Sequence, residues 1–232
     1  MYTLWFEEEL LASLESVETQ VRGVGSEGIT PQQIQELYGQ ARSVIRVYEP
    51  DVRNLGPAQP KTGREGTLWR LSLHFEFAPL SNGLQFTFAL CEAYLEGSID
   101  GEPKPQVYDL YPKHLYEDDG RTTSLKFDPS VKVAGVETSI GELSANMPMG
   151  RVAPVTSGFR GQDGRNPHWR IQPQKYPLVG ARDFFLAVEQ PAKCSGIVLR
   201  VRAEATIQTY WGPIEIGPKK YVWDSRPKIL IQ

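Results

Sequence analysis

The sequence predicts a mainly β fold, an antiparallel β-sandwich or open barrel that follows an N-terminal antiparallel helical hairpin. The first observation is a series of about eight to ten short segments beyond residue 66 in which apolar and polar residues alternate, the period of a strand with one buried face. The second is that no long helical pattern follows residue 50. The third is the absence of an internal repeat, which argues against propellers and solenoids. A chain of 232 residues is long enough for one β domain with an appendage.

The first 50 residues predict the helical hairpin. Within residues 4–21, leucine and valine side chains recur at intervals of four, three and four, the stripe of an amphipathic helix. Thr30, Pro31 and Gln33 have the positions of an N-cap, a first helical residue and a capping-box partner, and the apolar stripe continues to about residue 48. The hairpin either packs on the β domain or presents one face to another protein.

Residues 51–66 predict a linker, because they are polar, contain prolines and glycines and have no apolar period. This gives a domain organisation with the helical hairpin over residues 1–50, the linker over residues 51–66 and the β domain over residues 67–232.

The strongest strand patterns occur in two pairs. Residues 69–77 and 84–90 alternate strictly and are separated by turn-forming residues, which predicts a hairpin. Residues 184–189 and 196–210 are separated by a short connection, which predicts a second hairpin.

The alternation within residues 196–210 also predicts which side chains are buried. We expect one set to face the core and the other to face solvent. The core set includes Leu199, Val201 and Ile207, and the solvent set includes Arg200, Arg202 and Gln208.

Composition limits the class of protein. The formal net charge of −3 gives no reason to expect a nucleic-acid partner, and no apolar run is long enough for a transmembrane segment. The acidic N-terminus does not resemble a secretory signal. Cys91 and Cys194 each lie in or beside a predicted strand, which favours buried, reduced thiols and a cytoplasmic location, with a disulfide as the alternative.

Searches for catalytic and cofactor motifs favour a protein that is not an enzyme. The sequence contains no G-x-S-x-G elbow, no phosphate-binding G-x-x-x-x-G-K-[ST] loop and no H-E-x-x-H motif. We therefore expect no cofactor and no metal site. An acidic run that begins at Glu117 fails as a calcium-binding EF-hand loop, because Arg121 occupies a ligand position and Asp128 the place of the final glutamate. A hydrolase with a carboxylate site stays an alternative. Its candidates are Asp100, Glu117, Asp118 and Asp119.

Charge is distributed unevenly along the chain. Residues 1–50 hold eight carboxylates against three arginines, a net charge of −5. Residues 151–182 hold six cationic side chains against one carboxylate, a net charge of +5. Such opposite poles indicate either mutual docking or two separate contact surfaces.

The basic region predicts the binding site. In the loop over residues 157–182, cationic side chains alternate with aromatic ones, a combination that binds carboxylate or phosphate groups and adds cation–π attraction. The alternative is a solvated connection in which Trp169 fills the core. The candidate binding residues are Arg160, Arg165, His168, Trp169, Arg170, Lys175 and Tyr176.

These observations predict a non-enzymatic protein-interaction or regulatory module. A protein partner would contact the loop over residues 157–182, the acidic N-terminal helices or both. The alternative from another class is a membrane-active or binding β-sandwich that recognises an anionic lipid or glycan through the same loop.

Overall fold

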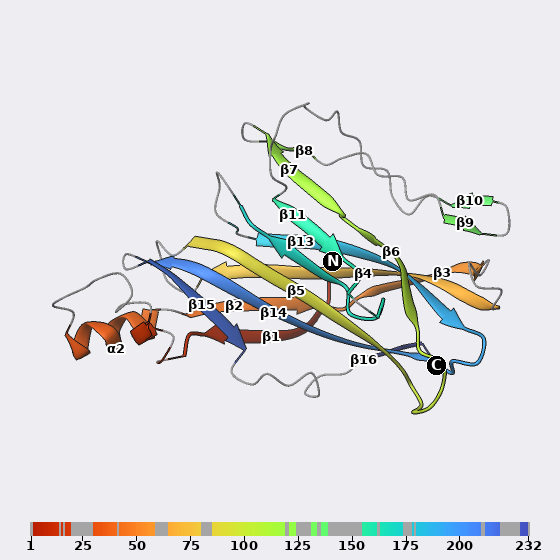
Figure 1. The fold of residues 1–232 in the computed structure, drawn as a ribbon, viewed down its shortest axis with the longest axis horizontal. Coiled ribbons are helices and arrows are strands. Elements are labelled where there is room, and N and C mark those ends of the chain that lie inside the picture. The colour runs from red at the N-terminus through yellow and green to blue at the C-terminus, as the bar shows by residue number, and fades with distance from the viewer. Residues whose placement is uncertain are drawn as a thin grey trace.

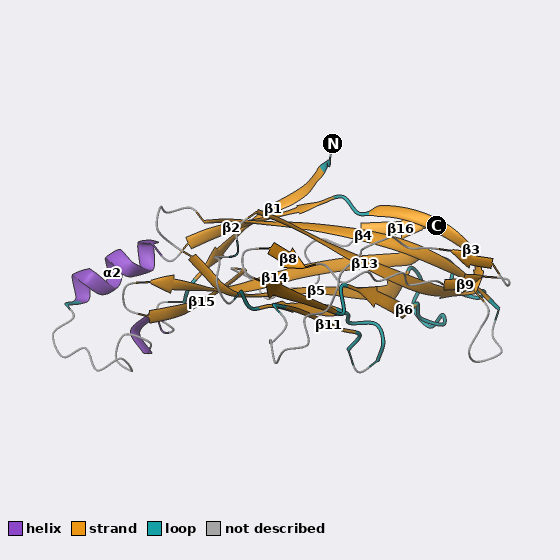
Figure 2. Ribbon diagram, turned by 90° about the horizontal axis from the view of Figure 1, so that it is seen from above, coloured by secondary structure: helices purple, strands orange, loops and turns teal. Residues whose placement is uncertain are grey.

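The computed structural model confirms that the chain is mainly β and antiparallel: the described residues form one continuous set of 14 paired strands, which divides into two sheets, and a separate two-stranded sheet (Figure 1). Seen from the edge, the molecule is long and flat, with the strands in layers (Figure 2). The structure describes residues 2–13, 15, 17–19, 30–40, 42–58, 65–79, 85–118, 121–123, 131–133, 136–138, 155–161, 163–173, 178, 180–209, 212–218 and 228–231.

The first sheet has the strand order β6-β13-β4-β2-β1, with β3 also paired to β4. Because β2 and β3 follow one another along the chain, they pair with successive halves of the same edge of β4. The strands are β1 (Leu4–Leu11), β2 (Arg42–Tyr48), β3 (Asp51–Ala58), β4 (Gly66–Pro79), β6 (Gln106–Tyr111) and β13 (Gly180–Pro191).

The second sheet has the strand order β15-β14-β5-β12-β11-β7-β8, and β16 also pairs with β14. The strands are β5 (Gln85–Gly97), β7 (His114–Asp118), β8 (Arg121–Thr123), β11 (Thr156–Phe159), β12 (His168–Ile171), β14 (Ile197–Thr209), β15 (Gly212–Pro218) and β16 (Lys228–Ile231). A separate hairpin consists of β9 (Val131–Val133) and β10 (Val136–Thr138). Pairing of β1 with β15 joins the two sheets into one path, so the choice between a sandwich and an open barrel stays a prediction.

Aromatic side chains from both sheets meet in one core. Phe77 of β4 contacts Phe86 of β5 edge to face, with ring centroids 5.6 Å apart. Trp169 of β12 stacks on Phe184 of β13 at 4.5 Å. All four side chains are fully buried. Their burial stabilises the fold by roughly 1.5–3 kcal/mol for each large apolar side chain, before the entropy of ordering is subtracted.

The predicted hairpins are wrong, although their strands exist. β4 and β5 lie in different sheets, and so do β13 and β14. Each connection therefore crosses from one sheet to the other. The alternation of side chains specifies a strand and its buried face, but two strands with inward apolar faces can bury them by stacking as well as by pairing.

The structure supports the predicted helical hairpin only weakly, with two short helical segments. Residues 15 and 17–19 and α2 (Pro31–Gln40) are helical, and Gln33 donates its backbone N–H to the Thr30 hydroxyl in the expected capping box. Leu4–Leu11 and Arg42–Tyr48, however, are the paired strands β1 and β2. Short isolated helices are marginal in water, so strand pairing along both segments prevails over the helical pattern.

The predicted linker is wrong for its first half. Asp51–Ala58 is the strand β3, which pairs with β4 as far as Gly66, and residues 59–64 lie outside the described part of the chain. The proposed domain boundary at residue 50 therefore falls between two strands of the same sheet. A strand that carries exposed side chains can contain polar residues and a proline. Strand β3, which pairs with β4, is such a strand and contains Pro57.

Both cysteines are buried as free thiols, in agreement with the sequence prediction. Burial raises the pKa of the Cys91 thiol well above its ordinary value and also raises that of Cys194. Since the thiolate is the reactive form, both should react slowly in the folded protein.

We predict that an exposed-thiol reagent such as Ellman's reagent modifies neither Cys91 nor Cys194 at neutral pH until denaturant is added, when two thiols per chain react. Rapid modification of the folded protein would contradict the burial of these side chains.

The side-chain pattern of β14 agrees with its predicted faces. Leu199 and Ile207 are fully buried, and Val201 packs partly buried against the core. Gln208 is exposed. Arg200 and Arg202 are half-buried on the other face because they form ion pairs with Glu96 and Glu92 of β5.

We predict that Leu199→Ala lowers the free energy of unfolding by about 2–5 kcal/mol, because it leaves a cavity between the sheets. Gln208→Ala, on the same strand, should change it by less than about 0.5 kcal/mol. Urea denaturation measures both. Equal losses would mean that both faces of β14 are buried.

Candidate functional site

The candidate site lies on the outer face of β11 and β12 and is called the β11–β12 patch: Phe159, Arg160, His168 and Arg170. Phe159 is 41% exposed, unusually open for a phenylalanine. The His168 ring stacks on it with centroids 5.0 Å apart and planes at 18°. The Arg170 guanidinium carbon lies 5.4 Å from the centre of the Phe159 ring, within cation–π range.

The pleat of β12 explains this arrangement. Trp169 and Ile171 point into the core, so His168 and Arg170 must point outward. The antiparallel register sets Phe159 opposite His168 and thereby brings the three outward side chains together. Within the part of the chain that the structure describes, Arg170 takes part in no ion pair.

Arg160 follows Phe159 and belongs to a small ionic cluster. Its Nη2 atom lies 3.2 Å from Oδ1 of Asp109, and the Lys113 Nζ lies 2.9 Å from the same oxygen. One carboxylate is thus shared by two cations. Asp109 belongs to β6, at the edge of the first sheet, and the cluster therefore connects β6 to the end of β11 in the second sheet.

Gly158 allows β6 and β11 to approach each other. A Cβ atom at this position would overlap Leu110 Cδ1 and the Pro112 carbonyl oxygen, and it would lie 3.0 Å from Trp169 Cδ1. The Gly158 N–H also donates to the Lys113 carbonyl at 2.9 Å. Only glycine fits at this position without displacing the backbone beside the patch.

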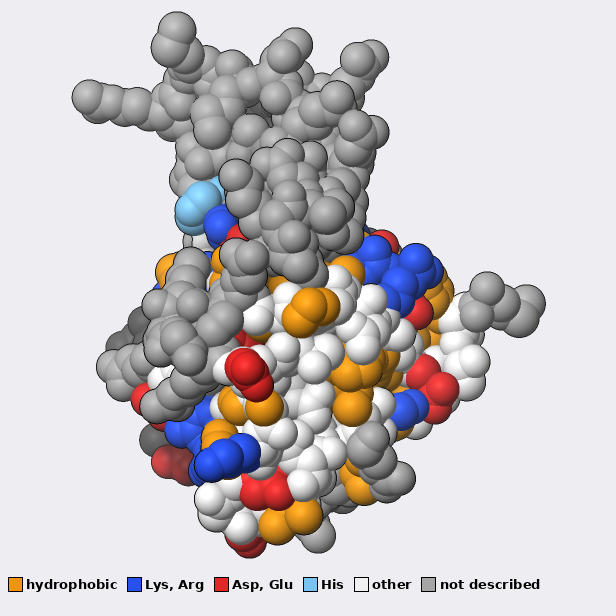
Figure 3. Space-filling view, turned by 90° about the vertical axis from the view of Figure 1, so that its right-hand side faces the viewer, with side chains coloured by type: hydrophobic (Ala, Val, Ile, Leu, Met, Phe, Trp, Pro, Cys, Tyr) orange, Lys and Arg blue, Asp and Glu red, His pale blue; other side chains and the backbone are white. Residues whose placement is uncertain are grey.

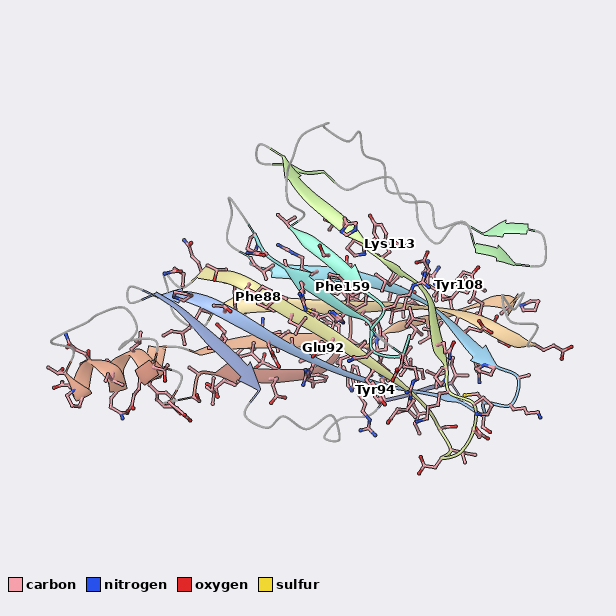
Figure 4. All side chains as sticks on the ribbon, in the orientation of Figure 1. Phe88, Glu92, Tyr94, Tyr108, Lys113 and Phe159 are labelled. Carbon is pink, nitrogen blue, oxygen red and sulfur yellow. The ribbon has the colours of Figure 1, made fainter. Side chains whose placement is uncertain are left out.

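Paired charges border the patch on β5 and β14. His168 lies opposite Glu92 of β5, which pairs with Arg202 of β14. Two residues earlier on β14, Arg200 forms an ion pair with Glu96 of β5, with 2.9 Å between Nε and Oε2. Figure 4 labels Phe88, Glu92 and Tyr94 along β5, Phe159 at the end of β11 and Lys113. The neighbouring face is thus electrostatically balanced, whereas the patch carries excess positive charge.

The structure brings together only part of the predicted site. Arg160, His168 and Arg170 lie in the patch. Trp169 is fully buried and contacts Phe184, so it fills the core and offers no surface to a ligand. Arg165 is largely covered and pairs with Asp163 at 3.0 Å. Lys175 and Tyr176 lie outside the described residues.

Sequence reasoning missed Asp109 and Lys113. They lie about fifty positions from the basic loop, and a carboxylate in a segment that fits no clear period gives no sign of its distant partner. Phe159 does stand among the cations of the loop in the sequence. Its exposure follows only from the register of β11.

The carboxylate hypothesis for a hydrolase gains no support. Asp100 is exposed on the connection after β5, and the side chains of Glu117 and Asp118 and all of Asp119 lie outside what the structure describes. Among the described residues no cluster of histidine, cysteine, aspartate and glutamate could hold a metal ion. His74 lies in the first sheet, 2.6 Å from Asp183, far along the strand path from His114 and His168.

Comparisons with known proteins show no family membership. No family model matches the chain, and no curated protein matches its sequence. Solved structures with partial similarity include Clostridium perfringens delta-toxin, at 9% identity, with 81% of this chain and 94% of that chain covered and a TM-score of 0.38. The membrane-inserted form of the Clostridium perfringens NetB toxin gives 9% identity, coverage of 77% and 86% and a TM-score of 0.30. The C-terminal domain of the Streptococcus agalactiae AgI/II polypeptide BspA gives 11% identity, coverage of 75% and 55% and a TM-score of 0.25. Scores this low identify no shared function.

Among the described residues, no helix has the length and apolar character needed to cross a membrane.

We predict that Gly158→Ala lowers the free energy of unfolding by about 1–3 kcal/mol and alters the patch, because the added methyl group overpacks the contact between β6 and β11. Gly39→Ala is the matched control. It lies in α2 with nothing within 4 Å of the added Cβ, and alanine should stabilise the helix there by up to about 1 kcal/mol. Thermal and urea denaturation compare the two, and equal effects would contradict the close approach.

Proposed function

We propose that this protein is a non-enzymatic, membrane-active β protein that binds bilayers carrying anionic headgroups through the β11–β12 patch. The observation that carries the proposal is the exposed Phe159 ring in contact with both His168 and Arg170, with Arg160 next to it in the chain. An aromatic ring with adjoining cations suits the interface of a bilayer, where one part of the site meets apolar chains and the other meets charged headgroups.

The energetics of the site agree with an anionic ligand. A guanidinium group can donate two parallel hydrogen bonds to one phosphate. Among the described residues Arg170 forms no ion pair, so phosphate binding would not have to break one. A basic residue near an anionic bilayer contributes about 1 kcal/mol. Arg160 shares the Asp109 carboxylate with Lys113.

A bilayer suits the patch better than a glycan or a protein partner. The exposed Phe159 ring is unfavourable in water, and transfer of the ring into the apolar region of a membrane would be favourable because it removes apolar surface from water. The protein-interaction hypothesis depended in part on an acidic helical hairpin, whereas the structure forms strands over Leu4–Leu11 and Arg42–Tyr48.

We predict that Arg170→Gln weakens binding to vesicles of mixed phosphatidylserine and phosphatidylcholine about fivefold, which corresponds to the loss of about 1 kcal/mol. Co-sedimentation at low and high salt measures the affinity, and the variant should also depend less on salt.

The matched control is Arg53→Gln, which removes the same charge from an exposed position on β3. Equal weakening by both variants would show that net charge, and not the patch, determines binding. Binding of the wild type to a sulfated glycan, without any binding to vesicles, would contradict the proposal and favour the glycan alternative.

A further inference from the structure

A second surface with membrane-binding chemistry lies at the end of the molecule opposite α2. There the connection between β5 and β6 lies beside the connection between β13 and β14 (Figure 1). We call these two connections, over residues 98–105 and 192–196, the end loops. Figure 3 faces this end and shows hydrophobic side chains interspersed with both cationic and acidic ones.

The end loops expose apolar side chains. Ile99 is 55% exposed, although isoleucine is among the residue types most often buried. Ile229 of β16 is 53% exposed, and β16 pairs with the first residues of β14 at this same end. Pro103 and Ala192 are also exposed. Single exposed apolar residues are ordinary, but here several lie at one end of an elongated molecule.

The two end loops are held to each other by specific bonds. The Glu102 carboxylate accepts hydrogen bonds from the Ser195 backbone N–H at 2.7 Å and from the Ser195 hydroxyl at 2.5 Å. These bonds lower the pKa of Glu102, so they are complete at neutral pH and weaken only as the carboxylate is protonated in acid. The Ser98 N–H donates to the Gly196 carbonyl at 3.1 Å. The exposed isoleucine therefore projects from an ordered base.

The backbone of the end loops is suited to an apolar surface. Gly101 has a φ of 87°, a conformation that favours glycine and turns the chain directly after Asp100. The exposed Pro103 has no N–H group, so this loop has one donor fewer to desolvate when it approaches hydrocarbon.

The charges of the end loops balance. The positive charges of Lys104 and Lys193 are matched by the negative charges of Asp100 and Glu102. The Glu102 carboxylate also accepts hydrogen bonds from Ser195. Attraction to an anionic surface is therefore weak here, in contrast to the β11–β12 patch. Burial of apolar area is the remaining driving force, and it does not depend on the charge of the lipid.

We infer that the end loops insert Ile99 into the interfacial region of a lipid bilayer and form a membrane contact separate from the β11–β12 patch. The inference rests on the proposed function in that the protein must bind a bilayer. It adds that part of this binding resists salt and persists on uncharged phosphatidylcholine, because it depends on apolar burial.

The test places a fluorophore at the loop. Since Cys91 and Cys194 are buried, Ile99→Cys supplies one accessible thiol for an environment-sensitive dye. Gln35→Cys, exposed on α2, is the matched control at the opposite end. With phosphatidylcholine vesicles, dye at position 99 should shift to the blue and be quenched by spin-labelled lipid, whereas dye at position 35 should not respond.

A second measurement uses unlabelled protein. The double variant Ile99→Ser and Ile229→Ser, with unchanged melting temperature, should bind phosphatidylcholine vesicles at least tenfold more weakly at high salt. Arg170→Gln should leave this salt-resistant component unchanged.

The outcomes separate the two proposals. If the protein co-sediments with anionic vesicles but dye at position 99 does not respond, the end-loop contact is wrong and the proposed function stands. If the protein binds no vesicle of either composition, both are wrong. A dye response that follows protein concentration without lipid would show that Ile99 contacts a second copy of the chain and would overturn the inference.

Discussion

The stacking of Trp169 on Phe184 is the interaction on which the candidate site depends. It joins β12 of the second sheet to β13 of the first in a fully buried contact at 4.5 Å. Because side chains alternate along a strand, fixing Trp169 inward also fixes His168 and Arg170 outward. The same core contact that holds the sheets together therefore orients the charged surface above it.

The charge distribution distinguishes this surface from the rest of its sheet. On β5 and β14, arginines face glutamates across the strands, and these partly buried pairs leave little net charge there. At β11 and β12 the balance changes, since two cations share Asp109 and Arg170 lies over an aromatic ring. Among the described residues, the acidic residues of 1–50 do not pair with Arg160 or Arg165 of the basic residues 151–182. Arg160 pairs with Asp109, and Arg165 pairs with Asp163.

The two proposed membrane contacts use different physical forces. The β11–β12 patch combines free positive charge with one exposed ring, so its affinity should follow lipid charge and ionic strength. The end loops combine exposed isoleucine with balanced charge, so their affinity should follow apolar burial. A protein with both contacts would approach a bilayer by electrostatic attraction and remain there by hydrophobic contact.

The sequence by itself determined the properties that depend on neighbouring residues. Alternation identified the strands and the buried face of β14, and Thr30 with Gln33 identified the start of α2. Only the tertiary structure decided which strands pair, because pairing joins residues far apart in the chain. It placed β4 and β5 in different sheets, turned Leu4–Leu11 into a strand and brought Asp109 to Arg160, 51 residues away. It also decided that Trp169 is core and Phe159 is surface, since this distinction depends on the register of β11 and β12 against the sheet and not on the residue types.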